Sequence, residues 1–142
     1  MSQSQATQTP AAHGPAMRAR PLSPHLTVYR WPITMTMSIL HRITGGALYV
    51  GTVLVAWWLI AAATSESQFG FVDWLVRSWF GKLVLIGYTW AMFHHMLGGV
   101  RHLVWDTGAG LEKHTASKLG WATLLGSIAL TVVVWAVYFA IA

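Results

Sequence analysis

Three long apolar segments, separated by short polar ones, dominate the 142-residue sequence. They predict helices over about 33–63, 82–105 and 119–141. A helix needs about 20 mostly apolar residues to cross a bilayer, and each segment meets that length. The pattern therefore predicts an all-α membrane protein with three transmembrane helices.

The polar segments predict what lies between and before these helices. Residues 1–17 carry no Asp, Glu, Lys or Arg and are rich in Ser, Gln, Ala and Pro, which is typical of a disordered tail. This leaves 18–142 as one three-helix membrane anchor domain. We expect a polar connection over 65–73, an interfacial amphipathic turn over 74–80, and a charged loop over 106–118. The third helix, whose only ionisable side chain is Tyr138, is expected to serve packing and anchoring.

The composition supports a membrane protein over other classes. Hydrophobic residues make up 55% of the chain and charged residues 9%, whereas soluble domains carry roughly 25% charged residues. The formal net charge of +5 comes from basic residues scattered between apolar runs, so we expect a lipid bilayer and no nucleic acid as partner. The chain has no Cys, which excludes disulfides, thiolate metal ligands and a thiol nucleophile.

The basic residues also predict an orientation. Lys and Arg are enriched in the cytoplasmic segments of membrane proteins. With three helices, the N-terminus and the second loop lie on one side, which holds seven basic residues, against two on the other. We therefore expect the N-terminus inside. The seven are Arg18, Arg20, Arg30, Arg42, Arg101, Lys113 and Lys118, and the two are Arg77 and Lys82.

Candidate chemistry concentrates in the second helix. His94 and His95 lie inside the apolar segment, and Arg101 and His102 follow near its end. A charge at the bilayer centre costs ~2.5–3.5 kcal/mol or more, and a neutral imidazole there still needs a partner. Because residues three and four apart lie on the same side of a helix, the polar residues of this segment fall on two neighbouring faces. One face carries His95, Gly99 and His102, and the other carries His94, Gly98 and Arg101.

Part of the first helix should lie at the same depth. The first helix begins on the side where the second one ends, which brings Ser38, His41 and Arg42 near the histidine-bearing segment. A neutral imidazole in a dry helix bundle suits the iron of a b-type haem. Arg or His nearer the surface could meet the haem carboxylates.

The same residues also fit a purely structural role. The histidines could be hydrogen-bonded packing residues, the glycines a close helix contact, and Arg101 and His102 interfacial anchors. A haem with two imidazole ligands would need a second deep histidine, which the third helix lacks, and His41 is shallower. A second ligand would then come from a partner subunit that completes the helical bundle.

Two motifs resemble the family of large membrane-anchor subunits, cytochrome b556, of succinate dehydrogenase (respiratory complex II). The first is Arg20-Pro21-Leu22 followed by Ser38-Ile39-Leu40-His41-Arg42-Ile43-Thr44. The second is the run from His95-Met96-Leu97-Gly98-Gly99-Val100-Arg101-His102 to Leu103-Val104-Trp105-Asp106-Thr107-Gly108. The resemblance covers about residues 18–142.

The resemblance implies a role for individual residues. His95, rather than His94, would be the axial ligand of one haem b shared with a smaller anchor subunit, which supplies the second ligand. Ser38 and Arg42 would line the ubiquinone pocket. His41, and Arg42 as well, would contact the haem propionates. Around the haem, the candidate supporting residues are Arg101 and His102.

The resemblance also implies a setting in a larger enzyme. The chain would anchor an iron–sulfur subunit and a flavoprotein subunit and pass electrons to ubiquinone as substrate, with no catalysis of its own toward succinate. A bacterial inner (plasma) membrane is favoured over the mitochondrial inner membrane. The alternatives are the anchor of a fumarate reductase and a haem-free structural anchor. A transporter or channel is disfavoured because it would need a polar stripe through the whole membrane depth, and the outer halves of all three helices carry none.

Overall fold

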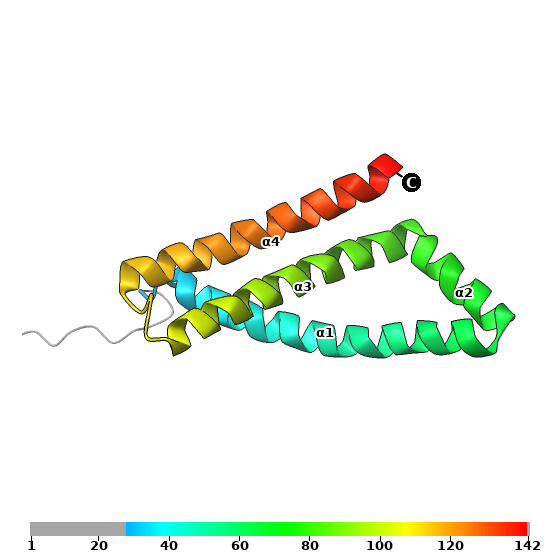
Figure 1. The fold of residues 1–142 in the computed structure, drawn as a ribbon, viewed down its shortest axis with the longest axis horizontal. Coiled ribbons are helices and arrows are strands. Elements are labelled where there is room, and N and C mark those ends of the chain that lie inside the picture. The colour runs from blue at the N-terminus through cyan, green and yellow to red at the C-terminus, as the bar shows by residue number, and fades with distance from the viewer. Residues whose placement is uncertain (1–27, 142) are drawn as a thin grey trace, which may run out of the picture. The chain divides into compact units, whose positions relative to one another are not determined.

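The computed structural model describes residues 28–141, and these fold into four helices (Figure 1). They are α1 (Ile33–Thr64), α2 (Glu66–Arg77), α3 (Trp79–Asp106) and α4 (Lys113–Ile141). The described residues contain no strand. Contacts divide the chain after Arg30, and all four helices belong to the unit that begins at Trp31. The expected tail over 1–17 lies outside the described residues.

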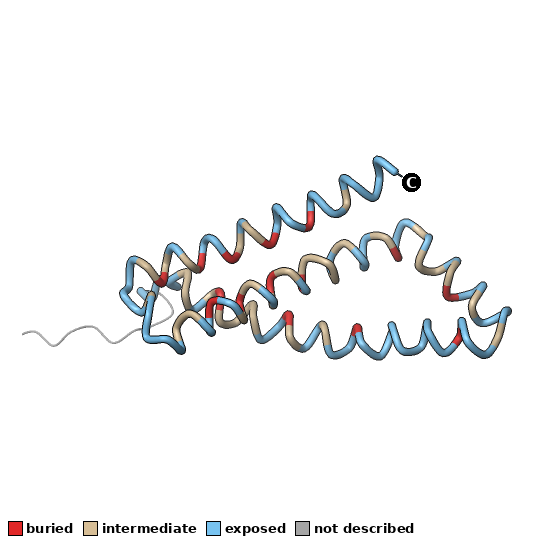
Figure 2. Tube along the Cα trace, in the orientation of Figure 1, coloured by how far each residue is buried: buried red, intermediate tan, exposed pale blue. Residues whose placement is uncertain are grey.

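Three of the helices are long and apolar enough to cross a membrane: α1 with 32 residues, α3 with 28 and α4 with 29. At 1.5 Å per residue, 28 residues extend about 42 Å, which exceeds a hydrocarbon core of about 30 Å. Exposed positions recur along all three helices (Figure 2), and many of them carry large hydrophobic side chains. The prediction of an all-α membrane protein with three transmembrane helices is confirmed.

The three long helices pack most closely where α1 begins, α3 ends and α4 begins. α3 contacts both α1 and α4, and α1 also touches α4. Small residues allow this approach, including Gly98 on α3 and Gly120 on α4, both of which are buried. Toward its C-terminus α1 diverges from α3, and α2 joins their separated ends (Figure 1), whereas α4 stays beside α3, where Trp135 Nε1 donates a hydrogen bond of 3.3 Å to the Thr89 hydroxyl. The packed end of the unit is therefore where polar side chains can be enclosed.

The segments expected to be a polar connection (65–73) and an interfacial turn (74–80) instead form helix α2 and the first residues of α3. Ser65 caps α2 by accepting a hydrogen bond from the Gln68 backbone N–H at 3.4 Å. Glu66 in the first turn and Arg77 in the last complement the helix dipole. These local signals favour a helix despite the polar composition of this segment. α3 then begins at Trp79, three residues earlier than expected.

The second loop is also shorter than expected. α4 begins at Lys113 rather than near residue 119, because its first turns are polar but still helical. Gly108 and Gly110 have positive φ angles of 79° and 72°, so they break the helix as predicted. Trp105 Nε1 donates a hydrogen bond of 3.1 Å to the Gly110 carbonyl, which fixes the loop against the end of α3.

Candidate functional site

A cluster of three histidines joins α1 to α3 at the packed end. The rings of His41 and His95 are stacked, with centroids 4.0 Å apart and planes 3° from parallel. The ring of His102 lies 5.3 Å from that of His41. The first helix therefore brings His41 level with His95, as the topology predicts, and the expectation that His41 lies at a shallower depth is wrong.

The hydrogen bonds of His95 define which of its ring nitrogens keeps a free lone pair. Nδ1 lies 3.1 Å from the His41 carbonyl oxygen and 3.5 Å from the Thr44 hydroxyl. A carbonyl oxygen can only accept a hydrogen bond, so Nδ1 of His95 carries the proton and donates a hydrogen bond to the His41 carbonyl. The lone pair is then on Nε2, which forms no hydrogen bond with a described residue. This is the tautomer that a metal-binding imidazole adopts.

Two glycines make room for the stacked pair, one from each helix. A Cβ at Gly45 on α1 would lie 2.9 Å from Cε1 of His95, and one at Gly98 on α3 would overlap Nδ1 of His41. The adjacent Gly46 and Gly99 have nothing within 4 Å of such a Cβ. Gly98 thus serves a close helix contact, the structural role that its sequence position allows.

His94 has a different environment from its neighbour. It is 0% exposed, its Nδ1 lies 3.4 Å from the Ser127 hydroxyl of α4, and its ring stacks on that of Trp90. Nε2 is buried with no hydrogen-bond partner. An external group could reach this histidine only if α3 and α4 moved apart. The 100° between adjacent helix positions separates His94, toward α4, from His95, toward α1.

Arg101 is buried without a counter-charge. It is 3% exposed, its guanidinium lies 5.1 Å from the centre of the Trp105 ring, and Nε and Nη1 have no hydrogen-bond partner. A cation–π contact is worth about 0.5–2 kcal/mol, but burying an ion costs several kcal/mol even after relaxation. All four acidic residues of the chain are among the described residues, and none pairs with Arg101.

Ser38 and Arg42 lie one turn apart on α1, outside this enclosed region. Ser38 is half-buried and Arg42 is exposed. Neither forms an ion pair or a hydrogen bond through its side chain with a described residue. The segment Arg20-Pro21-Leu22, which opens the first motif, lies outside the described residues.

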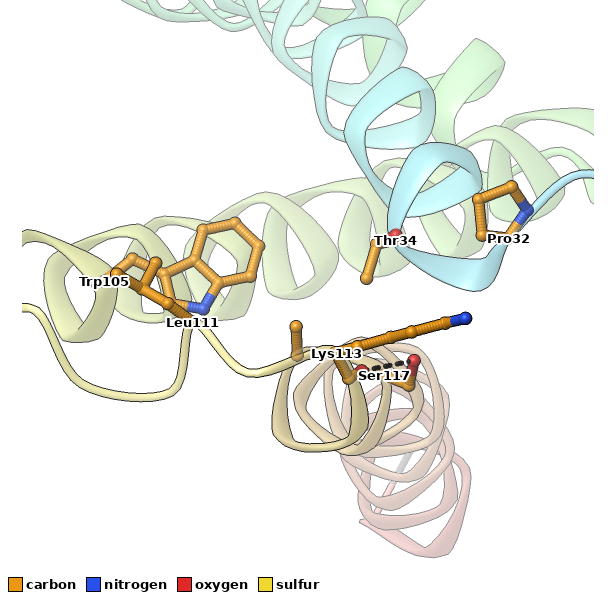
Figure 3. A pocket seen from close by; sticks show the side chains of 7 residues that line it. Pro32, Thr34, Trp105, Leu111, Lys113 and Ser117 are labelled. Atoms are coloured by element: carbon orange, nitrogen blue, oxygen red, sulfur yellow. Dashed lines mark hydrogen bonds between the residues drawn. The ribbon is translucent and has the colours of Figure 1, made fainter.

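A cavity of about 440 Å³ opens beside the packed end, next to Trp105 (Figure 3). It does not include Ser38 or Arg42. In Figure 3 the rings of Pro32 and Trp105 lie on opposite sides of the opening, and the Ser117 hydroxyl donates to the Lys113 carbonyl at 2.9 Å. The lining residues are Pro32, Thr34, Trp105, Leu111, Lys113, Ala116 and Ser117.

Several residues of the site escape prediction from sequence. Thr44 and Gly45 support His95, and Ser127 contacts His94, yet all three lie in apolar segments where small residues usually mean packing. For Ser127, the signal in the sequence was the periodic pattern of small residues along α4. Among the described residues, no group of three or more His, Asp or Glu side chains could hold a metal ion. An iron ligated by His95 would need other ligands from elsewhere.

The sequence matches the succinate dehydrogenase/fumarate reductase transmembrane subunit family over residues 17–134. It is 51% identical over 120 residues to the succinate dehydrogenase cytochrome b556 subunit of Paracoccus denitrificans, covering 84% of this chain and 92% of that one. The cytochrome b556 subunit of Rickettsia felis is 38% identical, with 82% and 90% covered. The mitochondrial cytochrome b560 subunit of Sus scrofa is 38% identical, with 75% and 64% covered.

Proposed function

Because this chain belongs to the succinate dehydrogenase/fumarate reductase transmembrane subunit family, we propose that it binds haem b and ubiquinone in a succinate:quinone oxidoreductase. In that role it anchors the enzyme in the membrane and helps to pass electrons from an iron–sulfur subunit to quinone. The chain itself has no chemistry toward succinate. It is a membrane-embedded subunit of complex II type, and the haem, the quinone and the electron transfer are the proposal.

The environment of His95 carries the proposal. Its Nδ1–H donates to the His41 carbonyl at 3.1 Å, which fixes the ring and leaves the Nε2 lone pair free. Haem iron binds such a neutral imidazole and supplies one-electron chemistry when bound. The ring nitrogens of His94 are not accessible to an outside group, because His94 is enclosed between α3 and α4. These features support His95 as the axial ligand.

The remaining residues of the cluster suit the edge of a haem. His41 has its Nδ1 enclosed against Gly98, which leaves Nε2 as the nitrogen that can meet a propionate. His102 is exposed beside it, and Arg42 lies one residue further along α1. The second axial ligand is assigned to a smaller anchor subunit, since α4 carries no histidine beyond its first turn.

Ser38 and Arg42 are proposed to bind the quinone headgroup. They are one turn apart on α1, and neither has an internal partner among the described residues. A quinone carbonyl gains negative charge on reduction. The Ser38 hydroxyl can donate a hydrogen bond to it, and the Arg42 guanidinium, which stays charged, stabilises the anion. Their exposure suits a pocket completed by other subunits.

The proposal also includes an orientation and a setting. The N-terminus and the loop between α3 and α4 face the cytoplasm, where their excess of Lys and Arg favours docking of the iron–sulfur and flavoprotein subunits. The relatives from Paracoccus and Rickettsia support a bacterial inner membrane as the location. Electrons then enter the membrane from that side.

The proposal is tested on the purified four-subunit complex. Haem content is measured as the pyridine haemochrome, with one haem b expected for each copy of this chain. Succinate oxidation is then measured with a water-soluble dye and with a short-chain ubiquinone, for the wild type and for Arg42→Leu. Loss of the guanidinium should lower quinone reduction by roughly tenfold or more and leave the dye rate nearly unchanged.

The matched control is Arg77→Leu, which removes an exposed arginine from α2 at the other end of α3. It should leave both rates unchanged. Equal losses of dye and quinone rates in Arg42→Leu would mean that Arg42 is needed for assembly and has no role at the quinone. A fully assembled complex without haem would refute the haem part of the proposal.

A further inference from the structure

A second cavity lies between α2, α3 and α4, at the end of α3 that is opposite the histidine cluster. Its volume is about 610 Å³, within the range of roughly 300–1,000 Å³ that is typical of ligand pockets. Each of the three helices contributes three of its lining residues, and none of them lines the first cavity or belongs to the candidate site. The first turns of α3 and the last turns of α4, which lie side by side (Figure 1), form two of its walls.

The part of this cavity that lies farther from the start of α3 has no spare hydrogen-bond donor. Trp135 Nε1 donates to the Thr89 hydroxyl at 3.3 Å, and that hydroxyl donates to the Leu85 carbonyl at 2.7 Å. The indole N–H and the hydroxyl hydrogen are therefore both used within this chain. Leu85 and Val134, which line the same part, have apolar side chains. These surfaces suit a hydrocarbon chain better than a polar solute.

The other part of the cavity carries one uncompensated positive charge. Arg77 and Asp73 of α2 both line it, and they offset each other in an ion pair of 2.7 Å between Nε and Oδ2. Lys82, near the start of α3, also lines it and is half-buried. Among the described residues, Lys82 forms no ion pair. A ligand with a single negative charge beside Lys82 would balance this end of the cavity.

Aromatic side chains place the charged end of the cavity at the level of the lipid headgroups. Trp79, three residues before Lys82, is 74% exposed, and Trp74 on α2 is 66% exposed. Tyr138, which lines the cavity, is exposed as well. Exposed Trp and Tyr gather at the membrane–water interface. Leu85 is six residues beyond Trp79, or about 9 Å along the helix axis, so it lies in the hydrocarbon layer.

We propose that this cavity binds a phospholipid with an anionic headgroup. The Lys82 ammonium donates to the lipid phosphate, and one acyl chain lies against Leu85, Val134 and the ring of Trp135. The cavity matches such a molecule because its unpaired cation lies at headgroup level and its apolar walls lie below that level. The inference goes beyond the proposed function and is independent of the haem and the quinone.

The test is a lipid titration of the intact purified complex after delipidation in detergent, with bound lipid counted by native mass spectrometry. The probes are phosphatidylglycerol and phosphatidylcholine with the same acyl chains, and the wild type should bind phosphatidylglycerol more tightly. Lys82→Gln should weaken the tightest phosphatidylglycerol site by about fivefold, the typical effect of one basic residue near an anionic lipid. Lys118→Gln, the matched control, removes an exposed lysine from the other end of α4 and should leave that site unchanged.

A second pair of variants tests the acyl-chain part without any change of charge. Val134→Phe fills the apolar part of the cavity and should weaken the binding of both lipids, whereas Val133→Phe, at an exposed position outside the lining, should not. Both valines are exposed, so the complex should assemble in either case.

Three results would overturn the inference. The first is a loss in Lys82→Gln that is no larger than in Lys118→Gln. The second is equal affinity of the wild type for the two lipids, because the charge of the headgroup would then not be recognised. The third is lipid binding that none of the four variants changes, which would indicate that a partner subunit fills the cavity.

Discussion

Gly98→Ala tests the close contact between α1 and α3 on which the candidate site depends. The added Cβ would overlap Nδ1 of His41 and lie 3.0 Å from its Cε1. The His41 ring cannot move away freely, because His95 is stacked on it at 4.0 Å. The substitution therefore has to separate the two helices or displace the ring.

The expected cost follows from two opposing terms. Overpacking a close-packed contact costs roughly 1–3 kcal/mol. Replacing glycine by alanine in a helix interior gains roughly 0.5–1 kcal/mol. For Gly98→Ala the difference is a net loss of roughly 0–2.5 kcal/mol, and the direct overlap with the His41 ring favours the upper part of that range. At Gly87, also on α3 but eight residues before His95, a Cβ meets nothing within 4 Å, so only the gain applies.

The assay is thermal unfolding of the purified complex, measured together with its haem spectrum. Gly98→Ala should unfold at a lower temperature than the wild type and bind haem less completely. Gly87→Ala should match the wild type or exceed it in both measurements. If the two variants behave alike, then His41 does not lie against Gly98 and the packing of α1 on α3 is not as described.

Two further predictions concern single contacts. Ser127→Ala removes the hydroxyl 3.4 Å from Nδ1 of buried His94, so stability should fall by about 0.5–1.5 kcal/mol; Ser117→Ala, which removes a hydroxyl bonded only within α4, should have a smaller effect in the same unfolding assay. Asp73→Asn removes a hydrogen-bonded carboxylate that raises the pKa of Arg77. Because that pair is exposed and the arginine is charged at neutral pH in either case, the unfolding temperature should not change measurably.

Much of the fold was predictable because it depends on hydropathy summed over long segments. The three membrane helices follow from 55% hydrophobic residues arranged in long runs that each suffice to cross a bilayer. The ends of the helices were harder to predict. They depend on single caps, such as Ser65 for α2 and Ser78, whose hydroxyl accepts from the Gly81 N–H at 3.0 Å, for α3.

The site was predictable in its members but not in its contacts. Helical periodicity shows that only one of His94 and His95 can face a given neighbour, but it does not say which helix lies on which side. That depends on how α3 packs between α1 and α4, through Gly45 and Ser127 among others. The burial of Arg101 was hidden for the same reason, since the sequence alone equally suggests an interfacial anchor.

The central claim is that His95, and not His94, ligates haem iron. The most direct measurement is a dithionite-reduced minus oxidised spectrum of the purified complex, with wild type, His95→Ala and His94→Ala compared at equal protein. The account predicts a b-type band in the wild type that is lost or shifted in His95→Ala. In His94→Ala the band should persist in position, even though the loss of a buried side chain lowers stability. A band abolished by His94→Ala and retained in His95→Ala would contradict the account.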